Sequence, residues 1–482
     1  MNSFYYGEVH KSLVINKINQ FLYSSWSIII FAILSLVSFV FSLELLFYSI
    51  VIVYALCVIS LGKDLAPLIP LFPLCYIAVS TNNNPGISDQ GIFYGVSGNL
   101  ILCLAAIVIV ALIMRISFDK KIGWKLFFTK RRALLPGLLL LSVAYFISGI
   151  GSAHYFDYVK SNVVFAFLQA MSILLLYFVF SATVRWDEFN VDYFAWAGLA
   201  SGLVVVFELI WVYISENVVV DGVIDRMSIV AGWGTYNNMG AIIASAVPFA
   251  FYFVCKKRNS ALYLLLALFL MVGILFSCSR SSIFFAFVAF IISYIYSLFK
   301  AKNKKGIYWV SAFIAVLAVL AVVKFSDKML EIFATVPFVF DVVDGDVIFN
   351  DSGRLDIYIK GWNEFLENPI FGQTFYSANS DVFDFSEVAE FSAFFPSRWH
   401  NTIIQLLASC GVVGLLAYCY HRYQTIRLFV KKRTTVNVYI GIYIVTLLGM
   451  SLLDCHFFNV GPVLFYSIAL AVMEYGKSMD KV

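Results

Sequence analysis

Long apolar runs, separated by short polar segments, dominate the pattern of this chain. Crossing the hydrocarbon core of a bilayer takes about 20 apolar residues in a helix. The runs are continuously apolar rather than alternating, which favours membrane-spanning helices over the strands of a membrane barrel. Because two of the fourteen candidate runs are short, we expect 12–14 spans. The runs lie near residues 26–43, 45–61, 65–80, 97–115, 133–151, 162–182, 191–214, 238–255, 261–278, 281–299, 307–325, 401–420, 435–453 and 456–474.

The composition agrees with this pattern. Hydrophobic residues make up 61% of the 482 residues and charged residues 13%, compared with about 25% charged residues in soluble domains. A soluble protein of this length would leave too much apolar surface exposed to water. The sequence therefore predicts an all-α polytopic membrane protein.

The basic residues indicate the orientation. Lys and Arg accumulate in alternate loops, and 25 of the 33 fall on one side, which the positive-inside rule assigns to the cytoplasm. Both termini, His10, His421 and Arg422 are expected on that side. The net charge of +4 reflects this bias, so it does not indicate a nucleic-acid partner. The outer face holds eight bases: Lys160, Arg226, Arg280, Lys324, Lys328, Arg354, Lys360 and Arg398.

One outer loop is long enough to form a small unit. It divides the chain into an N-terminal transmembrane bundle (1–325), a large extracytoplasmic loop (326–400) and C-terminal transmembrane helices (401–482). Within the loop, Asp351 or Ser352 can cap a helix that ends before Pro369. Its apolar residues predict one buried face, and it could lie along the outer membrane interface. These residues are Leu355, Tyr358, Ile359, Trp362, Phe365 and Leu366.

Arg280 is the most informative base of the outer face. It lies in the short hairpin FSCSRSS, which places its guanidinium at or below the membrane interface, where a charge is costly and indicates a function. Arg226 precedes a predicted span, Arg354 begins the predicted loop helix, and Arg398 lies beside His400. The alternative interpretation is structural, with snorkelling or helix capping by Arg280 and surface ion pairs or headgroup contacts for the others.

His400 is the histidine most suited to chemistry. It directly precedes a predicted span, so a side chain that titrates near neutral pH would lie at the rim of a membrane cavity. Glu208 is the only acid deep in a predicted span, and it could act as a proton relay. The eight cysteines show no paired spacing in an external loop, and no DxD-like or EF-hand-like cluster argues for a metal. The segment DVVDGD at 341–346 is expected to be a turn and is only weakly suggestive.

Four segments resemble motifs of the O-antigen ligase and O-antigen polymerase superfamily. HNTIIQLLASCGVVGLLAY resembles its HN-x-x-L…G-x-x-G segment, and SGRLDIYIKGWNEFLENPIFG resembles its R…W…NP-x-x-G loop. FSCSRSS is similar to its SRS hairpin, and DRMSIVAGWGTYNNMGA to its R…G…PN-x-x-G motif. The sequence departs from these patterns where Asn237 replaces a proline and where Thr374 replaces a second glycine after Gly372.

The resemblance implies a metal-independent, GT-C-like membrane glycosyltransferase without a cofactor. Its donor would be a glycan on undecaprenyl diphosphate, and its acceptor would be a saccharide, either lipid A-core or a growing glycan. The implied location is the bacterial inner membrane, with the active site facing the periplasm. By the resemblance, Arg226 and Arg280 would hold the donor diphosphate and His400 would be the catalytic residue. The further candidates for substrate binding are Arg354, Asn238, Asn401 and Arg398.

The residues leave several alternatives open. A neutral His400 could accept the acceptor's proton during an inverting transfer, while two arginines stabilise the departing diphosphate. The same motifs fit a ligase and a polymerase equally, and protein O-glycosylation is a third acceptor possibility. A flippase or another transporter would also have many spans, although midplane charges and related halves, which transporters typically show, are scarce here.

Overall fold

The computed structural model describes most of the chain, and every structural statement below concerns the described residues. These are residues 13–80, 95–118, 128, 131–152, 170–216, 218–220, 223–316, 340–343, 346–349, 354–373, 399–458 and 460–476. Nearly all of them are helical, and their strands form three two-stranded antiparallel hairpins. The predicted all-α class is confirmed.

The first part of the chain forms apolar helices with several breaks. Helices α2 and α3 meet at a bend of 63°. The third predicted span contains three prolines, and it is divided into η1 and α5 because proline lacks the amide that a continuous helix needs. The elements are α2 (Leu13–Leu22), α3 (Ser25–Phe41), α4 (Glu44–Leu61), η1 (Ala66–Leu68), α5 (Leu71–Ile77), α6 (Gly95–Phe118), α8 (Leu135–Phe146), η3 (Met171–Leu175) and α10 (Leu176–Thr183).

The remaining part holds the longest helices and the hairpins. Its helical elements are α11 (Glu188–Ser215), η4 (Arg226–Ser228), α12 (Tyr236–Lys256), α13 (Ser260–Phe276), α14 (Arg280–Lys300), α16 (Arg354–Glu367), α17 (Thr402–Lys431), α18 (Thr435–Met450), η6 (His456–Phe458) and α19 (Val460–Tyr475). The hairpins pair β1 (Val219–Val220) with β2 (Val223–Ile224), β3 (Val230–Ala231) with β4 (Gly234–Thr235), and β5 (Phe340–Val343) with β6 (Asp346–Phe349).

The helices support a polytopic membrane protein. Five helices in the described ranges are long and apolar enough to cross a bilayer, and the bent α2–α3 pair makes a sixth. Seven shorter apolar helices accompany them. The number of spans, 12–14, stays a prediction.

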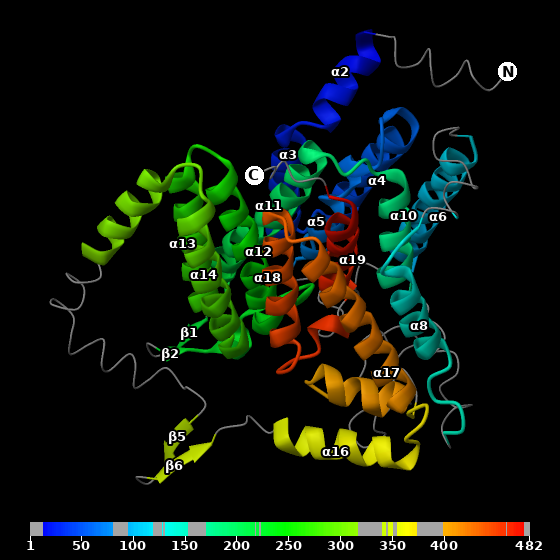
Figure 1. Cartoon of the computed structure of the whole chain (residues 1–482), viewed down its shortest axis with the longest axis vertical. Coiled ribbons are helices and arrows are strands. Elements are labelled where there is room, and N and C mark those ends of the chain that lie inside the picture. Colours follow the sequence, from blue (N-terminus) through cyan, green and yellow to red (C-terminus); the bar gives the residue numbers. More distant parts are fainter. Residues whose placement is uncertain are drawn as a thin grey trace.

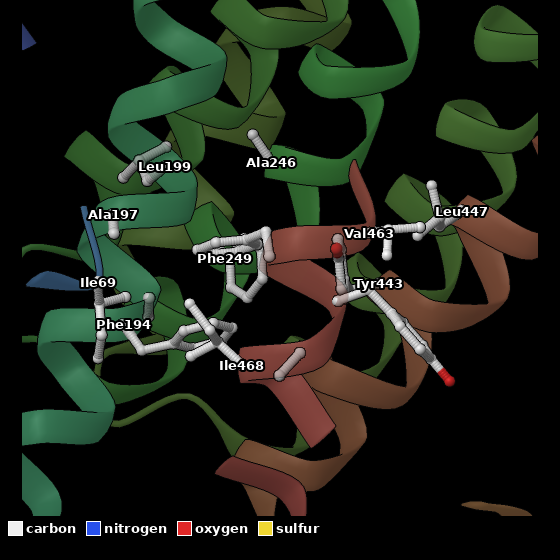
Figure 2. Close-up of a cluster of buried hydrophobic side chains, with 14 of the residues drawn as sticks. Ile69, Phe194, Ala197, Leu199, Ala246, Phe249, Tyr443, Leu447, Val463 and Ile468 are labelled. Atoms are coloured by element: carbon white, nitrogen blue, oxygen red, sulfur yellow. The ribbon is translucent and has the colours of Figure 1, made fainter. Parts of the chain in front are cut away.

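The core of the bundle surrounds α12, which packs against α11, α13, α14 and α18. Small residues let the helix backbones approach closely: Gly198 of α11 lies directly against the Phe249 ring, and Gly202 lies against Ala246. Figure 2 shows Phe249 beside Phe194 of α11 and Tyr443 of α18 in one apolar cluster. This packing gives the outer ends of α11, α12 and α18 fixed positions.

A break in α17 joins it to the end of α16. Gly411 has φ 62° and ψ −161°, a region of backbone space that only glycine enters readily. The amide of Val412 donates to the Pro369 carbonyl (2.9 Å), and the Gln373 amide donates to the Ala408 carbonyl (2.8 Å). The segment 369–373 thereby supplies partners for backbone groups that the break would leave unsatisfied. We call this contact the α16–α17 joint; in Figure 1, α16 and the first turns of α17 cross the lower end of the bundle.

The protein covers the predicted apolar face of α16 only in part. Gly361 and Phe365 are buried against the start of α17, where Gly361 makes room for Trp399 and Ile404. The neighbouring flank is exposed, and its position along the outer membrane interface stays a prediction. Its members and their exposed fractions are Leu355 (59%), Ile359 (51%), Trp362 (45%) and Leu366 (56%).

The predicted cytoplasmic positions of His421 and Arg422 are wrong. Helix α17 continues past the predicted end of its span at residue 420, and both residues lie on that continuation. The Tyr466 hydroxyl lies 2.7 Å from His421 Nε2 and accepts a hydrogen bond from Arg422 (2.6 Å). The guanidinium lies 4.4 Å from the Tyr418 ring and 4.6 Å from the Phe457 ring. Aromatic faces and a hydroxyl thus replace water around a cation inside the bundle.

Candidate functional site

The loop between α11 and α12 carries Arg226 and is anchored by Trp233. Trp233 Nε1–H donates to Oε2 of buried Glu208 (3.1 Å), and the Tyr76 hydroxyl donates to the Trp233 carbonyl (3.2 Å). Gly232 lies directly against the backbone of Ser80, where a Cβ would have no room. Glu208, the predicted relay acid, therefore has an anchoring contact that fixes the loop ahead of α12.

The hairpin before α14 lies against the first turns of α12. Ser279 Oγ donates to Asn237 Oδ1 (3.0 Å). The hairpin side chains pack so closely on Gly240 that a Cβ at this position would have no room. Arg280 is the first residue of α14, is half-buried, and has a buried Nε atom. Asn238 lies one residue after Asn237, against Gly234. The structure thus brings Arg280 and Asn238 to the same pair of helix starts.

Arg226 reaches the same region from the loop side. Its guanidinium lies 5.8 Å from the centre of the Tyr236 ring, at the first residue of α12. Burial raises the pKa of the Cys278 thiol, and a hydrogen bond from Tyr213 and the charge of Arg226 oppose that rise. Arg226 is therefore within electrostatic reach of the hairpin that holds Arg280. We call this group, Arg226, Asn238 and Arg280, the arginine group.

The electrostatics of the arginine group favour an anion. Helices α12 and α14 both begin here, and neither has an acidic residue in its first turn or a side-chain cap. A helix N-terminus carries about half a positive charge and unsatisfied amides. An arginine at such a position adds charge of the same sign. The site is therefore suited to phosphate-like oxygens, which arginine binds in a fork.

His400 forms the second part of the site together with Asp454. His400 Nδ1 lies 3.3 Å from Asp454 Oδ1; the His400 side chain is 36% exposed and the Asp454 side chain 7%. His400 has φ 46°, a left-handed conformation that is uncommon outside glycine. The Tyr358 hydroxyl donates to the His400 carbonyl (3.2 Å). A strained backbone held by neighbours is common where a side chain must keep a functional orientation.

Tyr358 connects His400 to two further predicted residues. Burial raises the pKa of the Tyr358 hydroxyl, while the Arg354 charge and a hydrogen bond involving Asn401 oppose the rise. Asn401 also caps α17: its Oδ1 accepts from the amides of Ile403 (2.8 Å) and Ile404 (3.2 Å). Asn401 therefore has a structural contact in addition to its place beside His400.

Helix α18 lies between the two parts of the site. Gly449, near its outer end, packs directly against the Phe285 ring, five residues after Arg280 on α14. The loop that follows α18 carries Asp454, five residues after Gly449. The start of α17 is tied to the same loop, since the Thr402 amide donates to the Ser451 carbonyl (2.9 Å). The outer end of α18 is thus shared by the arginine group and the His400–Asp454 pair.

Sequence reasoning missed Asp454 and Tyr358. Asp454 is the only acid between the last two predicted spans, in the short segment LLDCHFF. A single acid in so apolar a segment was the signal that could have identified it. Tyr358 was predicted only as part of a buried face. Arg398 lies outside the described residues, as do the proposed caps Asp351 and Ser352. Within the described ranges, no group of three or more His, Cys, Asp or Glu residues could hold a metal ion.

A comparison with known families matches part of the chain. Residues 264–419 match the family model described as O-Antigen ligase. The match runs from α13 to the middle of α17, so it includes Arg280, Arg354 and His400 but not Arg226 or Asp454. A search of curated proteins finds no match. Over these residues, the chain is therefore similar to the O-antigen ligase family.

Proposed function

We propose that the protein is a membrane glycosyltransferase of surface polysaccharide synthesis, which transfers a glycan from undecaprenyl diphosphate to a saccharide acceptor. The observation that carries this proposal is the pairing of an anion-attracting arginine group with a His–Asp pair across the outer end of α18. The match of residues 264–419 to the O-antigen ligase family model supports the same chemistry.

The arginine group would bind the donor. A diphosphate carries adjacent anionic oxygens, and Arg226 and Arg280 supply fixed cations whose charge does not depend on pH. The two helix starts beside them add amide donors. As the bond to the sugar breaks, the electron pair leaves with the diphosphate, and these groups stabilise the charge that develops there.

His400 would act at the acceptor. In the tautomer with its proton on Nδ1, His400 donates a hydrogen bond to Asp454 Oδ1, and Nε2 is unprotonated and able to accept the proton of an acceptor hydroxyl. The hydroxyl oxygen then forms a bond to the anomeric carbon from the side opposite the diphosphate, which inverts the configuration. Asp454 stabilises the imidazolium that results. Arg354 and Asn401, which lie around Tyr358, are placed to contact the acceptor.

We propose that this reaction needs no metal ion and takes place outside the cytoplasm. Two arginines can neutralise the leaving diphosphate in place of a divalent cation. The basic cytoplasmic loops predict that both termini lie inside and that the site faces the periplasm across a bacterial inner membrane. The division into a bundle (1–325), an outer loop (326–400) and C-terminal helices (401–482) would then place the acceptor between the last two units.

The acceptor decides between two forms of this function. A ligase joins finished glycan to lipid A-core, whereas a polymerase extends lipid-linked repeats. In a deletion strain, surface glycan one repeat long would identify a polymerase, and free lipid-linked polymer with bare core would identify a ligase.

Substitution of the two parts of the site tests the proposal. His400→Ala and Arg280→Ala should each lower glycan transfer at least 100-fold, because general-base and electrostatic contributions are of that order. Membrane accumulation should stay normal, and Lys360→Ala, on the exposed side of α16, serves as the control. Exhaustive chelation should leave wild-type activity intact. Wild-type glycan ladders from both variants would refute the mechanism, and a metal requirement would refute its metal-independent form.

A further inference from the structure

Gln405 is a buried polar residue that the proposed mechanism does not use. It lies in the first turn of α17 with 2% of its surface exposed. Its Oε1 accepts hydrogen bonds from the Trp399 amide (3.0 Å) and from the Cys455 thiol (3.5 Å), and its Nε2 donates to Ser409 Oγ (3.1 Å). Because an amide N–H can only donate, the group that faces Trp399 must be the carbonyl oxygen.

The two donors to Gln405 are the chain neighbours of the proposed functional pair. Trp399 directly precedes His400, and Cys455 directly follows Asp454. The Cys455 amide donates to Asp454 Oδ1 (2.7 Å), the same oxygen that lies 3.3 Å from His400 Nδ1. The contacts therefore form a closed ring of five residues, in which one Gln405 oxygen ties together two segments that are more than 50 residues apart in sequence.

The backbone at His400 makes such a restraint necessary. A non-glycine residue at φ 46° has a strained backbone, which persists only when its surroundings hold it. The Trp399 side chain is packed under Gly361 of α16, and the Tyr358 hydroxyl holds the His400 carbonyl. Gln405 holds the remaining backbone group, the amide that precedes His400.

We propose that Gln405 is a positioning residue, which sets the His400 imidazole against the Asp454 carboxylate through the Trp399 amide and the Cys455 thiol. This inference rests on the proposed function, since it assigns Gln405 a role only if the His400–Asp454 pair takes part in transfer. Gln405 does not touch the reacting atoms. Its effect therefore belongs in kcat rather than in the binding of donor or acceptor.

Gln405→Met is the principal test, because methionine keeps the length and the unbranched chain of glutamine but lacks the carbonyl acceptor. Glycan transfer by membranes should show kcat lowered about 10- to 100-fold, as expected for a misplaced catalytic group, with KM for donor and acceptor within twofold. Ser409→Ala removes only the partner of Nε2 and should leave kcat within twofold. An unchanged kcat in Gln405→Met, or a loss confined to KM, would overturn the inference.

A double-mutant cycle separates positioning from general damage to the fold. In an Asp454→Asn background, Gln405→Met should cause no further loss greater than about twofold, because both changes act on one contact. Independent, multiplicative losses would overturn the inference. If Gln405→Met fails to accumulate, Cys455→Ala breaks the ring at its other contact and should show the same coupling. Full activity of His400→Ala would overturn the proposed function itself. If His400→Ala is inactive but Gln405→Met is fully active, only this inference is overturned.

Discussion

Individual residues at the outer end of the bundle have unusual backbones or unusual charge surroundings. His400 and Cys278 both have positive φ values, 46° and 56°, and both lie within two residues of a helix start. At each position, hydrogen-bonded neighbours hold the strained turn: Tyr358 at His400, and serine side chains such as Ser279 at the hairpin. These two strained turns lead into the helices that begin at Arg280 and two residues after His400.

Cys278 offers a test of this arrangement by chemical labelling. Burial raises the pKa of its thiol, and only the thiolate reacts with maleimides. With Cys278 as the sole cysteine, a membrane-impermeant maleimide added outside should label it slowly at pH 7, and the rate should rise as the pH increases through and beyond the ordinary thiol range. An Asn363→Cys control on exposed α16 should react faster at pH 7. Equal rates at pH 7, or labelling only after lysis, would contradict the prediction.

The α16–α17 joint is the element that places His400. Two glycines make it possible: Gly411 in the break of α17, and Gly372 at φ 70°, which lies directly on the backbone at Ser409. The motif NP-x-x-G thus has a structural role here. The Pro369 carbonyl accepts a hydrogen bond from the broken helix, and Gly372 lets the two backbones approach closely. The first turns of α17 are rigid because α16 locks them, and His400 directly precedes those turns.

Gly411→Ala should break this joint. A Cβ at this position would collide with the carbonyl of Ile370, and the backbone conformation itself costs a non-glycine residue about 1–3 kcal/mol. We expect a clearly lower melting temperature in detergent and strongly reduced glycan transfer. Gly441→Ala is the matched control, because its Cβ would meet only the Phe429 side chain, at 3.0 Å, and the ring can shift. Equal melting temperatures of the two variants would contradict the structural role of the break.

The two ends of the molecule hold different elements. Helix α2 and the last turn of α19 lie at one end, and α16, β1 and β2 lie at the other (Figure 1). The ion pairs of Lys256 with Glu188 and Asp192 join α11 to α12 at their ends away from the arginine group. Arg422 lies inside the bundle and belongs to neither end. The count of basic residues assigned to the cytoplasmic side from the sequence is therefore too high by this one residue.

Reporter fusions test the orientation of these ends. Green fluorescent protein at either terminus should fluoresce, and alkaline phosphatase at either terminus should be inactive, because both predicted termini are cytoplasmic. Alkaline phosphatase inserted at Asn363, on the exposed side of α16, should be active. Active phosphatase at a terminus would reverse the orientation and would place the proposed site on the wrong side for a periplasmic reaction.

The sequence by itself determined the class of protein and pointed to most of the candidate residues. These follow from local properties. Runs of about 20 apolar residues are stable as helices across a bilayer, and basic residues in loops favour the cytoplasmic side of the membrane. Arg226, Arg280 and His400 could be found because a charged or titratable residue stands out in so apolar a chain.

Only the tertiary structure decided how these residues are held. Asp454 contacts His400 across more than 50 residues of sequence, and Gln405 contacts Trp399 across a helix start. No local pattern reports such contacts. The same reason explains the partial cover of α16 and the error at Arg422. A helical pattern shows which side chains are apolar or charged, but the neighbouring helix decides which flank is covered and which cation is surrounded by aromatic rings instead of water.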